Sequence, residues 1–128
     1  MNDCIFCKLA NGEIPTKMVY QDDVVAVFMD ANPNTNGHML VVPRKHVVDF
    51  TEIDDETLVH IHKLIKEKLQ PMVYEKLGAC GLKIVNNYGS EQQVKHYHVH
   101  VIPFYEDTKV VIPHAEGNID EVFEKLTK

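Results

Sequence analysis

Residues 96–103 read His-Tyr-His-Val-His-Val-Ile-Pro, so that histidines alternate with apolar residues at Tyr97, Val99 and Val101. Side chains of a β-strand point alternately to its two faces. We therefore expect a strand over 97–102 with one face directed to a core and one face of imidazoles. A neutral imidazole can act near pH 7 as a nucleophile, a general acid or a metal ligand. The histidine face thus indicates either a metal site or a phosphate site.

Apolar patterns on both sides of this stretch predict the other elements. A short helix is expected over 4–10, and helical spacing beyond Thr51 predicts a long helix that Pro71 should kink or interrupt. Asn118-x-x-Glu121 resembles a capping box and predicts a second short helix. Further β-rich runs predict strands at 18–20, 24–29, 38–42 and 82–85. These elements predict an α+β fold with a mainly antiparallel five-stranded sheet, one long helix and two short ones.

Length and charge narrow the classes of protein. The 128 residues predict a single domain over 1–128, with a short C-terminal tail from about residue 106. The 13 Lys and Arg against 19 Asp and Glu give a net charge of −6, which argues against nucleic acid or a membrane surface as a partner. The longest apolar run, 24–29, is too short to cross a membrane, and the start lacks a secretory pattern. We expect a cytoplasmic protein.

Two of the three cysteines form Cys4-x-x-Cys7, which is half of a zinc site. His46 and His96 are available as the two further ligands. The redox interpretation of such a pair prefers a preceding βαβ unit, which this chain does not offer. The third cysteine, Cys80, is expected to be a small buried residue.

Two other segments carry polar groups beside this pattern. His38 follows the turn Asn36-Gly37 at the head of a strand, where its side chain can face a cleft. Residues 86–92 form a polar loop that joins two strands and delivers amides beside the histidines. Taken alone, His38 would be an ordinary polar surface residue, and the loop would be an ordinary turn.

Together these motifs resemble the histidine-triad (HIT) family of nucleotide-binding proteins and hydrolases. The resemblance is carried by residues 96–103, by Gln92-Gln93-Val94-Lys95 before them and by the segment 37–43, and it extends from Cys4 to Pro103. It implies that His98 attacks the α-phosphorus of a nucleotide and that water then hydrolyses the nucleotidyl-histidine. It also implies that a backbone carbonyl orients the His98 ring.

The resemblance assigns roles to further residues. His38, His100 and Gln92 would hold the phosphate oxygens while negative charge builds up on them. Asp30 would accept hydrogen bonds from both ribose hydroxyls, and Asn86 would lie near the ribose and phosphate. The apolar residues that would enclose a purine base are Ile5, Phe6, Leu9 and Phe28.

The resemblance further implies a structural zinc ion held by Cys4, Cys7, His46 and His96, with no catalytic metal. It implies a homodimer in which two sheets join into one, and a purine nucleotide or nucleotidyl conjugate as the ligand. Two positions depart from the family pattern: Gln93 stands where relatives often carry Ser or Thr, and Phe104 where many bacterial relatives carry a basic residue. Because of both departures, the resemblance does not determine which leaving group is preferred.

The function that these features favour is hydrolysis of nucleoside 5′-phosphoramidates. One alternative is hydrolysis of dinucleoside polyphosphates, because Gln92-x-Val94-Lys95-His96 resembles the fragile-histidine-triad branch, whereas Cys4-x-x-Cys7 opposes that assignment. A second is a nucleotide-binding module with negligible turnover. A third makes His96, His98 and His100 the ligands of a catalytic metal.

Overall fold

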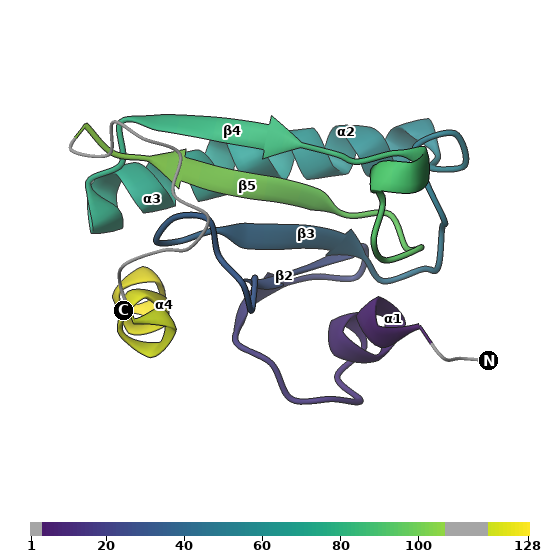
Figure 1. The fold of residues 1–128 in the computed structure, drawn as a ribbon, viewed down its shortest axis with the longest axis horizontal. Helices are drawn as coiled ribbons and strands as arrows, with labels where there is room; N and C mark the ends of the chain where they lie inside the picture. Colours follow the sequence, from purple (N-terminus) through teal and green to yellow (C-terminus); the bar gives the residue numbers. More distant parts are fainter. Residues whose placement is uncertain (1–3, 107–117) are drawn as a thin grey trace.

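The computed structural model describes residues 4–106 and 118–128. Its centre is one antiparallel five-stranded sheet with the strand order β1-β2-β3-β5-β4 (Figure 1). The strands are β1 (Met18–Gln21), β2 (Val25–Met29), β3 (Met39–Pro43), β4 (Gly81–Val85) and β5 (Val99–Phe104). Because β5 inserts between β3 and β4, the histidine segment lies beside the middle of the sheet. The expected α+β class and five-stranded sheet are confirmed.

A long helical segment packs along one face of the sheet, as Figure 1 shows. It consists of α2 (Asp55–Leu64), the π-helical turn η1 (Ile65–Leu69) and α3 (Gln70–Leu77). Asp54 caps its start by accepting the N–H of Thr57 at 3.0 Å. Pro71 has no N–H to donate, and the helix accommodates it with the π-helical turn just before it. The predicted interruption is therefore a local change of helical winding.

The main hydrophobic core lies between the sheet and this long helix. Tyr97, Val99 and Val101 are buried in it, as their alternation with the histidines predicts. Opposite them the helix contributes apolar side chains at helical spacing, including Ile61, Leu64, Ile65, Leu69 and Val73. Each such buried side chain stabilises the fold by about 1.5–3 kcal/mol. The apolar face thus fixes which way the histidines can point.

The opposite face of the sheet is covered only in part. Helix α1 (Ile5–Ala10) packs Phe6 and Ala10 against a small cluster that contains Phe28 and Leu40. Helix α4 (Ile119–Thr127) packs Val122 and Leu126 into the main core instead. It begins at the predicted cap, where the side chain of Asn118 accepts backbone N–H groups. The uncovered part of this face is open to ligands.

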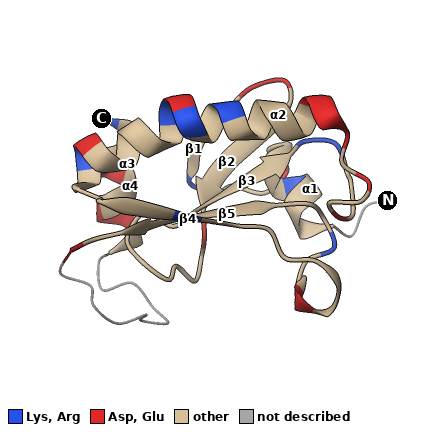
Figure 2. Ribbon diagram, turned by 90° about the horizontal axis from the view of Figure 1, so that it is seen from above, with Lys and Arg blue, Asp and Glu red and all other residues tan. Residues whose placement is uncertain are grey.

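Charged residues are absent from β1, β2, β3 and β5 and lie mostly on the helices and the loops (Figure 2). No helix within the described ranges is long and apolar enough to cross a membrane.

Two local expectations are wrong. Strand β5 begins at Val99, because the N–H of Tyr97 bonds the carbonyl of Val47 at 2.6 Å outside the sheet, so His96 and His98 precede the strand. Cys80 is exposed, because it precedes the edge strand β4 outside the core.

Candidate active site and metal centre

A cavity of about 620 Å³ opens on the face of the sheet that carries the histidines. Six of the residues that the sequence singled out line it: Phe6, Leu9, Phe28, Asp30, His98 and His100. They come from α1, from β2 and its end, and from the segment that runs into β5. The fold thus brings parts of the chain that are up to 94 residues apart in sequence to one cavity.

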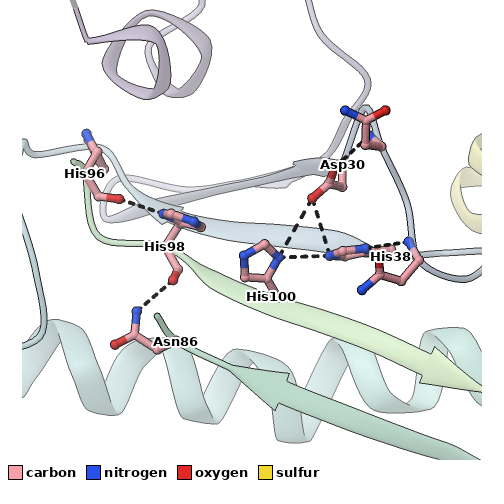
Figure 3. A network of polar contacts seen from close by, with 8 residues as sticks. Asp30, His38, Asn86, His96, His98 and His100 are labelled. Atoms are coloured by element: carbon pink, nitrogen blue, oxygen red, sulfur yellow. Dashed lines mark hydrogen bonds and ion pairs between the residues drawn. The ribbon is translucent and has the colours of Figure 1, made fainter. Parts of the chain in front are cut away.

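His98 is held by its own main chain. Its Nδ1 lies 2.7 Å from the carbonyl oxygen of His96, and the amide of Asn86 donates to the carbonyl of His98 at 2.8 Å (Figure 3). A carbonyl can only accept, so Nδ1 carries the ring proton and Nε2 keeps a lone pair. Burial lowers the pKa of His98, which keeps the ring neutral. The ring has the protonation state and orientation of a nucleophile.

His38, His100 and Asp30 form a second network at the same cavity (Figure 3). Nε2 of His38 lies 2.9 Å from Nδ1 of His100, and an Asp30 oxygen lies 3.4 Å and 3.8 Å from these two nitrogens. Burial lowers the pKa of His38. Burial, followed by the neighbouring His98 and His38, lowers the pKa of His100 to about 4. All these rings are therefore neutral near pH 7.

Four of the residues predicted to act in catalysis or nucleotide binding do not line the cavity: Ile5, His38, Asn86 and Gln92. His38 and Asn86 contact it indirectly, through His100 and the backbone of His98. Gln92 is buried, and its amide nitrogen donates to the carbonyl of Val48 at 2.5 Å. Ile5 is exposed on α1. The phosphate role of Gln92 and the base contact of Ile5 remain predictions.

Four polar residues to which the sequence assigns no role at the site also line the cavity: Thr16, Asn87, Glu91 and Gln93. Thr16 follows α1, while Asn87 and Glu91 belong to the loop between β4 and β5. That loop indicated only amides delivered beside the histidines, and nothing in its residue types distinguishes Glu91 from an ordinary solvated acid. The place of Glu91 at the cavity depends on the path of the whole loop between β4 and β5.

The four predicted metal ligands lie together at one end of the site. Their ligand atoms, the sulfurs of Cys4 and Cys7 and Nδ1 of His46 and His96, are all within 4.8 Å of one another. Nδ1 of His96 is 3.3 Å and 3.4 Å from the two sulfurs, and Nδ1 of His46 is 3.2 Å from that of Cys7.

The hydrogen bonds around this cluster suit a metal ion. Nε2 of His96 lies 2.8 Å from the carbonyl of Pro43, so the ring proton is on Nε2 and Nδ1 presents a lone pair to the sulfurs. Burial and the adjacent Cys4 raise the pKa of Cys7 to about 11, so a thiolate at Cys7 needs a cation beside it. Two cysteines and two histidines are a donor set that zinc prefers.

Comparison with known proteins places these features in context. The HIT domain family matches residues 11–107. An uncharacterized HIT-like protein of Methanocaldococcus jannaschii is 44% identical over 128 residues, covering 96% of this chain and 98% of its own length. The adenosine 5′-monophosphoramidase of Schizosaccharomyces pombe is 33% identical over 102 residues, covering 78% of this chain and 73% of its own. A zinc-bound histidine triad family protein from Mycobacterium smegmatis superposes with a TM-score of 0.89 at 30% identity, covering 98% and 91% of the two chains.

Proposed function

The chain belongs to the HIT domain family, and on that premise we propose that it hydrolyses nucleoside 5′-phosphoramidates at the α-phosphate, with His98 as the nucleophile. The observation that carries this proposal is the hydrogen bond from Nδ1 of His98 to the carbonyl of His96, at the wall of a cavity. Proteins of this family are nucleotide hydrolases or transferases, and one relative is named as a phosphoramidase.

The proposed reaction has two steps. Nε2 of His98 donates its lone pair to the α-phosphorus, the bond from phosphorus to the amine breaks, and the amine nitrogen takes up a proton from solvent as it leaves. Water then attacks the same phosphorus and returns a proton to solvent, and the bond to Nε2 breaks to release a nucleoside 5′-monophosphate. Throughout, the proton stays on Nδ1 of His98 and is donated to the carbonyl oxygen of His96, which stabilises the positive charge of the nucleotidylated ring.

His100 and His38 stabilise the phosphate oxygens in this proposal. Nε2 of His38 donates to Nδ1 of His100, so the proton of His100 is on Nε2 and is available to a phosphate oxygen. A donor placed in advance at the developing charge contributes about 3 kcal/mol to the transition state.

The nucleoside occupies the rest of the cavity. Phe6, Leu9 and Phe28 give apolar walls to the base, and the carboxylate of Asp30 accepts hydrogen bonds from the ribose. One Asp30 oxygen already accepts the N–H of Asn32 at 2.7 Å, which fixes the orientation of this carboxylate. Asn86 acts through the backbone of His98.

We assign Cys4, Cys7, His46 and His96 to a structural zinc ion, which would link these four side chains to one another. The role of His96 is then double. Its ring is a ligand, and its carbonyl orients the nucleophile. The N-terminal helix, with the apolar wall of Phe6, is tied to the same residue.

The charge of the cavity favours phosphoramidates over dinucleoside polyphosphates. Asp30 and Glu91 line it, and no Lys or Arg is among its described lining residues. A polyphosphate leaving group carries several negative charges and is repelled there, whereas an amine is neutral or positive. Dinucleoside polyphosphate hydrolysis remains the second candidate, through the same chemistry at His98.

We also propose a homodimer that continues the sheet across β4. This strand pairs only with β5 among the described strands, and its Ile84 is about half exposed beside the exposed Val59 of α2. Pairing of two β4 strands would cover an edge and an apolar patch together. Sedimentation of Ile84→Lys tests this: a monomer is expected, and an unchanged mass would contradict the dimer contact.

The test of the function is steady-state hydrolysis of adenosine 5′-phosphoramidate and of diadenosine polyphosphates in parallel. We expect a preference for the phosphoramidate. His98→Ala should lose turnover by a factor on the order of 10³ or more while nucleotide affinity stays within about tenfold. His60→Gln, which lies outside the cavity, is the matched control. An active His98→Ala enzyme would refute the covalent route.

A further inference from the structure

Asp30, His38 and His100 form a second group of possible metal ligands. Their ligand atoms also lie within 4.8 Å of one another. Two imidazoles and a carboxylate are a donor set that binds divalent metal ions in many enzymes. By residue type and spacing alone, this cluster should compete with the cysteine cluster for metal.

The backbone of Asn34 gives this cluster a different proton arrangement. The N–H of Asn34 points at Nδ1 of His38, at 3.0 Å. An N–H can only donate, so Nδ1 must accept, and the single proton of the neutral ring lies on Nε2. That proton is directed at Nδ1 of His100, 2.9 Å away. The nitrogen of His38 that faces the cluster is therefore protonated and offers no lone pair to a metal.

His96 has the reverse arrangement. The backbone group behind its ring is the carbonyl of Pro43, which takes the proton of Nε2 and leaves Nδ1 free to ligate. A carbonyl behind an imidazole thus makes a metal ligand of it, and an N–H behind an imidazole makes a hydrogen-bond donor of it.

The loop that presents the Asn34 N–H is held at several points. Thr35 donates its hydroxyl to the carbonyl of Pro103 at 2.7 Å, and Tyr105 donates to the carbonyl of Asn36 at 2.6 Å. Gly37 has a φ of +89°, and a Cβ there would lie 2.6 Å from a methyl group of Leu77. The backbone N–H of Asn34 therefore cannot turn away from His38 without disturbing these contacts.

We propose that the backbone N–H of Asn34 is a positioning group that fixes the proton of His38, and thereby excludes divalent metal ions from Asp30, His38 and His100. The same proton arrangement directs Nε2–H of His100 to substrate, and only this second consequence rests on the proposed function.

The first test compares Asn34→Pro, which removes the N–H, with Asn34→Ala, which keeps it. Each zinc-loaded protein is titrated with Co²⁺, and the visible absorption of the bound metal is measured. We expect Asn34→Pro to bind an additional equivalent about tenfold or more tightly than wild type and Asn34→Ala do. Asp30→Asn in the Asn34→Pro background should abolish that gain. Equal Co²⁺ binding by all three proteins, or a gain that survives Asp30→Asn, would overturn the proposal.

The second test needs no variant that could misfold. Two-bond ¹H–¹⁵N spectra of the wild-type imidazoles report which nitrogen of each ring carries the proton. We expect His38 to be protonated on Nε2 with Nδ1 as an acceptor, and protonation on Nδ1 would overturn the proposal. Neither the spectrum nor the Co²⁺ titration depends on turnover, so a chain with the expected tautomer but without hydrolysis would refute the proposed function alone.

Discussion

At one end of the site His96 donates to the carbonyl of Pro43 and presents a lone pair to two cysteines. At the other end His38 accepts the N–H of Asn34 and directs a proton to His100. The residue type and the burial are alike, and burial lowers the pKa of both rings. What differs is the backbone group behind each ring. The polarity of one main-chain contact thus selects between a metal ligand and a hydrogen-bond donor.

Removing the hydrogen-bond donor His100 should reduce activity more than any other change below. In His100→Asn we expect kcat to fall by about 10²-fold, because a donor to the phosphate oxygens is lost, with metal content unchanged. The measurement is steady-state hydrolysis together with metal analysis. Metal loss in this variant would show that the two ends are not separate in function.

Removing the two cysteine ligands of the metal should mainly lower the stability of the fold. Cys4→Ser combined with Cys7→Ser should abolish zinc binding and lower the melting temperature by about 10 °C, because the binding energy of the metal is coupled to folding. Metal analysis and thermal unfolding measure this. Cys80→Ser, at the exposed third cysteine, is the matched control and should change neither. Unchanged metal content in the double variant would move the metal site elsewhere.

Acid should destabilise the folded protein through protonation of His100. The pKa of His100 is lowered from 6.5 to about 4, so below pH 6.5 the unfolded chain takes up a proton that the folded chain refuses. The stability is complete above pH 6.5 and declines as the pH falls toward 4, by up to about 3 kcal/mol from this residue. Urea unfolding at several pH values should show a smaller decline in His100→Asn than in wild type. Equal declines would contradict the burial of a neutral ring.

Asp22 provides a contrast in the same titration. Burial alone would raise its pKa, but hydrogen bonds from the backbone of Val25 and Val24 and from the side chains of His60 and Tyr20 lower it to about 2. The contribution of Asp22 to the stability of the fold is lost only as the pH falls from about 4 toward 2. This range lies below the pH range in which His100 acts.

The smallest effect concerns the leaving group. Glu91→Gln removes one negative charge from the cavity wall, so kcat/KM for diadenosine polyphosphates should rise about threefold relative to the phosphoramidate. Glu75→Gln, exposed on α3, is the control for net charge. An unchanged ratio would show that this carboxylate does not face the leaving group.

The sequence predicts much of this architecture for identifiable reasons. The alternation of Tyr97, Val99 and Val101 with histidines predicts their burial, because a two-residue period depends only on local geometry. The resemblance to the HIT family predicts that two cysteines and two histidines lie close enough to share a metal ion and that a backbone carbonyl contacts the His98 ring. The four side chains do lie together, and Nδ1 of His98 is 2.7 Å from the carbonyl oxygen of His96.

The remainder depends on contacts that residue types do not encode. Strand β5 starts late because of the carbonyl of Val47, about 50 residues upstream of Tyr97 in the chain. Gln92 directs its amide to Val48 through a similar long-range contact. The Asn34 donor leaves no signal at all, because every residue except proline supplies a backbone N–H.

The most direct test of the central claim is to stop the reaction of wild-type protein with adenosine 5′-phosphoramidate within the first turnover and to locate the adenylyl group by peptide mass spectrometry. Wild type should carry the adenylyl group on His98, and His98→Ala should carry none. Turnover without an adduct, or an adduct on another residue, would contradict this claim.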